Sequence, residues 1–451
     1  MKKFLLKQSL VLLSVLFASV TMISCSNDSE LGSVDTRATQ SITVSGVITG
    51  TNDWSGTVYL DGKVFLVDGT LNIAAGTTII GKAKSTAELA SALIITKTGT
   101  INADGTNGVI VFKGETDTKG AWGGLVVLGT AAINQSAAKT IEGITTAQAA
   151  GNDITYGTPA QTKTEAEIDA LNNVSSGTLK YVRVENAGAS ISDANELNAF
   201  TFGGVGALTT VEHCQAYHGA DDAFEFFGGA VNCKYLVATA NDDDAFDFDF
   251  GYRGKIQFAV ATIDPSLTYS SDPNGIECDN DGSSSAFTPF THPVLSNLTI
   301  VGTSTGATSA SVALKSAADF RRNCQFTLVN SILYGFPRGI LKETANTTYT
   351  LENNVVCAVP STGINFSADK TATTTFTPSS TNSGLTSYSS IILTSPFGNY
   401  YDSNDLKPTG GAAINGSYYQ HTDSFFAQTT YKGAIDKSTR VNSWLQENWI
   451  R

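Results

Sequence analysis

Residues 220–251 of this chain read ADDAFEFFGGAVNCKYLVATANDDDAFDFDFG. The segment DAFEF at residues 222–226 returns as DAFDF at residues 244–248, which is 22 residues later. In both copies the phenylalanines alternate with small or acidic residues, and this period of two is typical of a β-strand. Glycines follow each copy and mark turns. A strand and a turn that recur at this interval predict one coil of a repeating β-structure.

The same frame continues on both sides of the quoted stretch. Further copies of the strand occur at residues 199–202, 275–279, 311–315, 339–342 and 363–366. A second short strand precedes each of these copies. Two strands per turn of roughly 22 to 36 residues, without helical periodicity, predict an all-β fold: a single-stranded right-handed parallel β-helix with terminal caps. We expect the solenoid over residues 41–398 and a C-terminal capping segment over residues 399–451, packed on the last coil.

Stacked coils lie about 4.8 Å apart, so that equivalent positions form columns. We expect two inward columns, one of Phe200, Phe224, Phe246 and Ile276 and one of Phe202, Phe226, Phe248 and Cys278. We expect an outward column of Thr201, Glu225, Asp247 and Glu277, and beside it a column of Asp249, Asp279 and Lys315. Carboxylates at this spacing repel one another unless water and salt screen them or a cation lies between them.

Composition limits the classes of partner. The chain has 451 residues, 42 glycines, 15% charged residues and a net charge of −13. Low charge and high glycine content fit a turn-rich β-protein, which a solenoid can build as one long domain. The acidic balance and the absence of a basic patch argue against nucleic acid as a partner and against electrostatic docking on anionic membranes.

The beginning of the chain has the pattern of a bacterial export signal. Two lysines precede an apolar run at residues 10–20, and Met-Ile-Ser-Cys at residues 22–25 resembles a lipobox. We therefore expect a lipoprotein signal peptide over residues 1–24, acylation of Cys25 with palmitate among the acyl chains, and a polar tether over residues 25–40. An ordinary secretory signal with a chance cysteine is the alternative. No later stretch is long and apolar enough to span a bilayer.

Five further cysteines are spread over the repeats: Cys214, Cys233, Cys278, Cys324 and Cys357. Their odd number leaves at least one of them unpaired, and Cys214 takes a core position in the repeat frame. We therefore expect buried apolar thiols rather than a disulfide framework. No CxxC motif is present, which argues against a zinc or redox site.

Several other motifs occur in a characteristic order: LNIAAGTTIIG at residues 71–81, WGGL at 122–125, LKYVRV at 179–184 and TDSFF at 422–426. Together with the repeated acidic and Gly-Gly motifs, they resemble the β-helical surface lipoproteins of Bacteroides-type bacteria. The acidic stretch SNDSE after Cys25 is similar to the surface-export signal of such lipoproteins. That family has no established reaction. The resemblance implies a β-helix that is lipid-anchored in the outer membrane and faces the cell exterior.

The acidic cluster is the strongest candidate site. We expect its metal ligands to be Asp222, Glu225, Asp244, Asp247, Asp249, Glu277 and Asp279. Calcium binds six to eight oxygens from carboxylates, carbonyls and water, and adjacent coils could supply them. The alternative is a solvated acidic face on which aspartates fill turns. The loops at residues 264–281 and 283–293 should hang beside this cluster.

An extended solenoid face suits a polymer, so we expect a binding module for a glycan or another surface partner, with calcium as a structural or bridging ion. The alternatives are a polysaccharide lyase or a glycoside hydrolase, and a structural adhesin. Some lyases on this fold hold calcium and use a lysine or arginine as the base, and the candidates here are Lys315, Arg253 and Arg321. Hydrolysis would need a carboxylate pair at a suitable separation. The enzyme hypotheses require one of the three bases within reach of the acidic column.

Overall fold

The computed structural model describes residues 41–192, 195–343, 348–397, 406–436, 444–445 and 448–451. The expected signal peptide, the lipidated Cys25 and the tether lie outside these residues. All of the described residues belong to one compact unit, Thr39–Arg451. Within the described ranges, no helix is long and apolar enough to cross a membrane.

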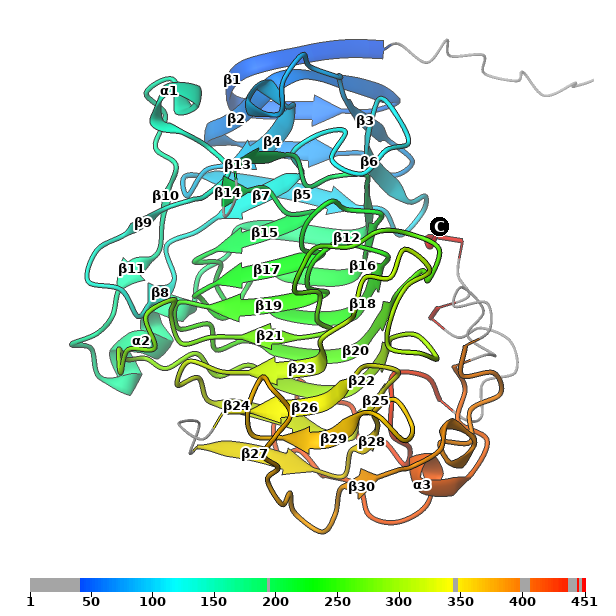
Figure 1. The fold of residues 1–451 in the computed structure, drawn as a ribbon. Coiled ribbons are helices and arrows are strands. Elements are labelled where there is room, and N and C mark those ends of the chain that lie inside the picture. Colours follow the sequence, from blue (N-terminus) through cyan, green and yellow to red (C-terminus); the bar gives the residue numbers. More distant parts are fainter. Residues whose placement is uncertain (1–40, 193–194, 344–347, 398–405, 437–443, 446–447) are drawn as a thin grey trace, which may run out of the picture. The chain divides into compact units, whose positions relative to one another are not determined.

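A 24-stranded sheet forms the body of the protein and coils on itself. It begins with β1 (Ser41–Trp54) and β2 (Thr57–Ile73), which pair in parallel. Each later strand pairs in parallel with its equivalent one coil further along the chain, as β15, β17 and β19 do. Figure 1 shows the coils stacked in chain order from blue to yellow. This arrangement confirms the predicted all-β, β-helical fold.

The coils present three faces. The front face consists of β4 (Ala92–Ile95), β7 (Leu125–Leu128), β15 (Phe200–Gly203), β17 (Phe224–Phe227), β19 (Phe246–Asp249), β21 (Glu277–Cys278), β23 (Ser316–Phe320), β26 (Arg338–Lys342) and β29 (Ile364–Ser367). The side face contains β3 (Thr78–Gly81), β6 (Ile110–Gly114), β25 (Ile332–Tyr334), β28 (Val355–Cys357) and β30 (Ser383–Gly384). The back face contains β5 (Gly99–Asp104), β24 (Phe326–Val329) and β27 (Tyr349–Glu352).

Five longer strands turn the corner from the back face to the side face. They are β12 (Gly177–Glu185), β16 (Thr210–Tyr217), β18 (Asn232–Thr239), β20 (Lys255–Thr262) and β22 (Val294–Val301). One residue adopts a left-handed conformation at each of these five corners and at the two later corners, between β24 and β25 and between β27 and β28. The φ angles lie between 51° and 63° for Tyr181, His213, Tyr235, Phe258, Asn297, Asn330 and Asn353. The first four stack as rings, with centroids 4.3 to 5.3 Å apart. Asparagine tolerates this conformation well, whereas the aromatic residues need the stacking to hold them there.

The phenylalanine columns are present inside the β-helix as predicted. The rings of Phe200 and Phe224 stack with centroids 4.8 Å apart, and those of Phe226 and Phe248 with centroids 5.2 Å apart. All four side chains are at most 1% exposed. The five predicted buried thiols are also confirmed, since Cys214, Cys233, Cys278, Cys324 and Cys357 are free and buried.

The predicted register is wrong after β21. The expected strand after β21 was residues 311–315, with Lys315 beside Asp279, but β21 pairs with β23 so that Cys278 lies beside Phe320 and Glu277 beside Asp319. Residues 302–315 form a loop instead, in which Ala307 and Ala313 make an antiparallel bridge. The apolar alternation of residues 311–315 imitates a strand, but Phe320 fills the lumen better because its large ring is fully buried.

A long insertion follows β7 and covers the upper part of the front face. It contains β8 (Ala132–Ile133), β9 (Lys139–Thr140), α1 (Thr146–Ala149), β10 (Thr155–Tyr156), β11 (Thr158–Pro159) and α2 (Glu165–Asn172). Ile141, Ile144 and Tyr156 of the insertion pack with Val126 and Phe227 of the front face. A shorter hairpin of β13 (Ser190–Ser192) and β14 (Asn195–Glu196) precedes β15.

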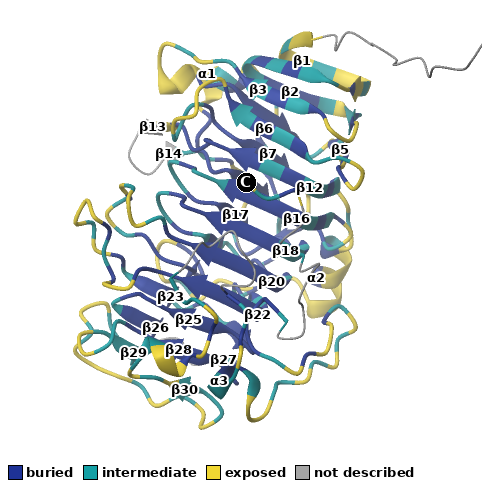
Figure 2. Cartoon of the chain, turned by 90° about the vertical axis from the view of Figure 1, so that its right-hand side faces the viewer, coloured by how far each residue is buried: buried dark blue, intermediate teal, exposed yellow. Residues whose placement is uncertain are grey.

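The described parts of residues 406–451, which we call the C-terminal strap, lie along the side face rather than over the last coil as predicted. They include α3 (Gly411–Ile414). Leu406, Ala434 and Trp449 pack with outward side chains of the side face such as Val237 and Ile332. Figure 2, which turns that side toward the viewer, shows these strands buried. The strap follows this route because the side face carries apolar side chains outward that need a cover.

Candidate functional site

The outward acidic column is present on the front face. Because Phe224 and Phe226 point into the lumen, Glu225 between them must point outward. Strand pairing aligns Glu225 with Asp247, and Asp247 with Glu277, as predicted. Upward the column runs through Thr201 to Val126, and downward it ends on Asp319, which the sequence frame had not included.

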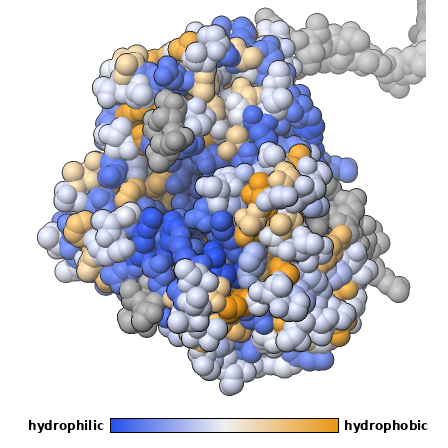
Figure 3. Space-filling view, viewed as in Figure 1, coloured by the Kyte–Doolittle hydropathy of each residue, from blue (hydrophilic) through white to orange (hydrophobic). Residues whose placement is uncertain are grey.

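Most of the acidic side chains are buried rather than solvated, and Asp247 is half-buried. Glu225 is 6% exposed, Asp222 7%, Asp244 5% and Glu277 9%. The loop between β20 and β21 covers them, because Ser270 donates to Asp243 and the backbone N–H of Asn274 donates to Asp244. The alternative of a solvated acidic face is therefore wrong for these residues. Figure 3 shows hydrophilic side chains gathered in a recessed part of the front face.

Three carboxylates converge at the centre of this recess. One oxygen each of Asp222, Glu225 and Asp247 lies within 4.8 Å of the other two. No ion pair among the described residues involves any of these three side chains. One oxygen of Asp247 is buried without a hydrogen-bond partner, and so is the hydroxyl of Thr201 in the next coil. We call Asp222, Glu225 and Asp247 the carboxylate triad.

The protonation of the triad follows from its burial. Burial, together with the charges of Asp244 and Asp221, raises the pKa of Asp222 well above its usual range. Burial and the charge of Glu142 act in the same direction on the pKa of Glu225. Burial raises the pKa of Asp247 to about 6, although Arg321 opposes this change. Without a cation the triad therefore retains protons at neutral pH.

Glu142 reaches the triad from the insertion after β7, and sequence reasoning missed it. Its carboxyl group is hydrogen-bonded to that of Glu225, so one of the two carries a proton. Burial raises the pKa of Glu142 to about 7. The amide of Asn198 also donates to Glu225. Glu142 belongs to an insertion, where no periodicity could have placed it, whereas Asn198 takes the place of Asp222 in the preceding copy of the repeat, which reads NAFTF.

The lower half of the predicted ligand set is already neutralised by arginine. Arg321 forms ion pairs with Glu277 and Asp279, and its Nε lies 2.9 Å from Oδ1 of Asp279. Arg322 lies 2.7 Å from the other oxygen of Asp279. Arg321 follows Phe320 in the corrected register, and it occupies the place that the sequence frame gave to Lys315. Glu277 and Asp279 are consequently poor candidates for metal ligands.

The remaining predicted residues lie outside the triad. Asp244 accepts from the backbone N–H of Asn274, while Oδ1 of Asp249 accepts from the backbone N–H of Phe250. Arg253 forms its ion pair with Glu165 of α2, away from the column. The backbone of Lys315 bonds to Pro273 and Arg338, while Glu277 and Asp279 of the column pair with Arg321. Of the three predicted bases, the structure brings Arg321 alone to the acidic cluster.

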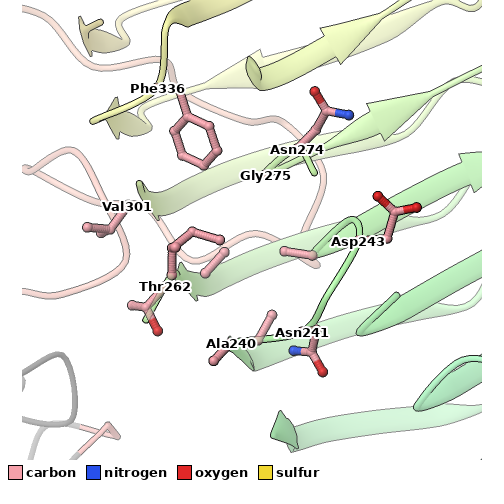
Figure 4. Close-up of a pocket in the computed structure, with 12 residues that line it drawn as sticks. Ala240, Asn241, Asp243, Thr262, Asn274, Gly275, Val301 and Phe336 are labelled. Carbon is pink, nitrogen blue, oxygen red and sulfur yellow. The ribbon is translucent and has the colours of Figure 1, made fainter. Parts of the chain in front are cut away.

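A small cavity lies behind the cluster, under the loop between β20 and β21. Its volume is about 10 Å³, and Asn241, Asp243, Thr262, Asn274 and Phe336 are among its lining residues (Figure 4). This space corresponds to about one water molecule. It is too small for an organic ligand, so any ligand of the triad has to bind from the recess in front.

The arrangement suits two kinds of chemistry. Three carboxylates can offer up to six oxygens, and hard cations such as Ca²⁺ bind oxygen ligands in that number when water completes the shell. The Glu142–Glu225 pair, with one shared proton, has the composition of a general acid beside a carboxylate. Ca²⁺ would displace the protons of the triad, so the two states exclude one another at Glu225.

Comparison with known proteins identifies the fold family. A protein-family model, described as a pectate-lyase-like β-helix domain, matches residues 46–403, which is most of the chain. A search of curated proteins and a search of solved structures each returned no match. The matched region contains β2 to β30 and every residue of the carboxylate triad. The chain therefore belongs to the family of pectate-lyase-like β-helix domains.

Proposed function

We propose that this protein is a binding module for a polysaccharide and that Asp222, Glu225 and Asp247 hold Ca²⁺ at the binding face. The observation that carries the proposal is the convergence of three carboxylate oxygens within 4.8 Å, free of any ion pair with a lysine or arginine of the described residues. Such a cluster is unfavourable without a cation or protons. The family and the long front face support a polysaccharide as the ligand.

The cation is tested by thermal unfolding of the full chain in chelator and in millimolar Ca²⁺. We expect Ca²⁺ to raise the Tm by a few degrees, because a ligand that binds the folded state stabilises it. The variant D222N/E225Q/D247N should lose this response. Asp169→Asn, which changes an exposed carboxylate on α2, is the matched control and should keep it. An identical Tm in chelator and Ca²⁺ for the wild type would contradict the cation proposal.

The polysaccharide is tested by retention on a panel of plant, host and microbial polysaccharides with Ca²⁺ present, while new chain ends are measured. Retention without new ends supports the binding module. Retention with new ends would make the protein an enzyme. If neither occurs, a protein partner or a structural adhesin becomes the better hypothesis.

Glycoside hydrolysis is the second candidate, and one observation favours it. Glu142 and Glu225 form a hydrogen-bonded carboxyl pair in which burial raises the pKa of Glu142 to about 7. The hydrogen bond raises the pKa of Glu225 and lowers that of Glu142, so Glu225 holds the shared proton and is the general acid of the pair. If new chain ends appear, Glu225→Gln should remove them. A lyase has less support, because its base would be Arg321, which already binds Glu277 and Asp279.

We also propose that the chain is a lipoprotein acylated at Cys25 and displayed on the outer membrane toward the exterior. The support is the lipobox-like sequence at residues 22–25. Labelled palmitate should enter the wild type and should not enter Cys25→Ala. Protease added to intact cells should remove the protein if it faces outward, and should spare it if it faces the periplasm.

A further inference from the structure

A second cavity lies beside the loop between β22 and β23. Its volume is about 360 Å³. Its lining includes five hydroxyl side chains and one aromatic ring: Thr303, Ser304, Thr305, Thr308, Ser309 and Phe397. No charged side chain lines it among the described residues. A cavity of this size matches a small organic ligand, and its lining favours a neutral one with many hydroxyl groups.

One of these hydroxyls is buried and unpaired. Thr303 and Thr305 both donate to the carbonyl of Ala307, at 2.8 and 3.1 Å, and Ser309 donates to the carbonyl of Pro265. Thr308 is only 6% exposed, and its hydroxyl has no hydrogen-bond partner. The Thr308 hydroxyl lies inside the wall rather than on its surface, so the side chains that face the cavity are the exposed Ser304, Thr305 and Ser309.

The aromatic ring is fixed in its place. Phe397 makes edge-to-face contacts with Tyr388 and Tyr334, with centroids 4.7 and 5.4 Å apart. Tyr388 also donates to the carbonyl of Ser304, which ties the aromatic group to the hydroxyl-bearing loop. A rigid ring opposite hydroxyl donors and carbonyl acceptors can hold the apolar face of a sugar while its hydroxyl groups are hydrogen-bonded.

We propose that this cavity is a subsite for one neutral pyranose unit of the polysaccharide. This inference rests on the proposed function and names the sugar class that the protein takes. The cavity and the acidic cluster share one loop, since Pro265 lines the cavity and Ser270 donates to Asp243. Pro265 and Ser270 are five positions apart, so their Cα atoms lie within about 18 Å of each other and this loop connects the cavity to the cluster.

The test uses methyl glycosides of glucose, galactose and mannose, with methyl galacturonoside as the charged comparator, and measures binding to the full chain by saturation-transfer NMR. We expect at least one neutral glycoside to bind with a Kd of about 1 to 10 mM. Phe397→Leu should weaken it about tenfold and Ser304→Ala, at an exposed hydroxyl of the lining, about threefold. Phe287→Leu, at an exposed phenylalanine elsewhere, is the control and should bind as the wild type does.

Three outcomes would overturn the subsite: no glycoside binds, both variants bind as the wild type, or the galacturonoside binds as well as the neutral sugars. The variant D222N/E225Q/D247N separates this inference from the cation proposal. It should lose the Ca²⁺ response and keep glycoside binding. If the wild type binds glycosides but not Ca²⁺, the cation proposal alone fails.

Discussion

Asp222 illustrates how the position of a single carboxylate follows from the repeat. Its Oδ1 accepts from the backbone N–H of Asp244, 22 residues later, at 2.8 Å. Its other neighbours in the triad lie on β17 and β19, where the lumen phenylalanines force Glu225 and Asp247 outward. Core packing therefore brings the three carboxylates together, and their mutual repulsion lowers the stability of the folded state.

At this scale the first prediction concerns Asp247. Asp247→Asn removes one of the mutually repelling charges without leaving a cavity. In chelator at pH 7.5, we expect its Tm to exceed that of the wild type by about 1 to 3 °C, because the substitution removes a half-buried carboxyl group whose pKa is raised to about 6. Asp169→Asn should leave the Tm unchanged. A lower Tm for Asp247→Asn would show that the carboxylate is held by attractive contacts instead.

The phenylalanine repeat predicts three of the site's residues and misses two of their neighbours. Thr201, Glu225 and Asp247 were placed correctly, because each lies between two apolar residues of a copied strand. Glu142 arrives from an insertion, where no repeated pattern relates sequence position to coil position, whereas Asn198 stands one copy before Asp222 and escapes a search for carboxylates because it is an amide. Hydrogen bonds across such segments depend on tertiary packing that a single sequence does not encode locally.

At the scale of elements, the corrected register of β23 gives a sharp test. Phe320 is fully buried beside Cys278, so Phe320→Ala should cost about 3 to 5 kcal/mol of unfolding free energy. Val312 lies in the strand that the sequence predicts at residues 311–315, but it is only partly buried in a loop. Val312→Ala should therefore lower the unfolding free energy by about 1 kcal/mol or less. Denaturant unfolding measures both, and equal costs would contradict the register.

The strap offers a second test at this scale. Trp449 is 3% exposed, and its ring meets Tyr181 and His213 edge-on, with centroids 6.1 and 5.7 Å away. Trp449→Ala should lower the unfolding free energy by about 3 kcal/mol, and Trp449→Phe should lower it less. Amide exchange at the corner residues Tyr181 and His213 should rise in the alanine variant. Unchanged amide exchange at these two residues would indicate that the strap does not protect the stacked rings at the corner.

The sequence suggested a C-terminal cap because every solenoid has an exposed end. It did not show that the side face carries apolar side chains outward. A β-strand that is covered on both faces is apolar throughout, so it lacks the alternation of apolar and polar residues that would mark its outward positions. Val237 and Val260 are buried, but they pack in the hydrophobic cluster between the side face and the strap rather than in the lumen.

For the whole molecule, the buried carboxyl groups predict how stability depends on pH. Burial raises the pKa of Asp243 and Asp319 to about 6 and that of Glu142 to about 7, above their values in an unfolded chain. The folded state therefore binds more protons than the unfolded state between pH 4 and 7. In chelator, we expect the Tm to fall as the pH rises from 5 to 8, and Ca²⁺ to remove most of that fall. A Tm that rises over this interval in chelator would contradict these shifts.

The route of the strap also changes how such a solenoid can come apart. Coils that touch only their neighbours unravel one at a time from either end, like a linear chain of weakly coupled units. Here the backbone N–H of Arg451 donates to Gln215, while that of Gly433 donates to the carbonyl of Asn330, so one segment clasps coils more than a hundred residues apart. Unfolding that starts at the last coils must first detach the strap from the side face. The middle of the solenoid should consequently melt as a single cooperative block, and the loose first coil at β1 should yield separately.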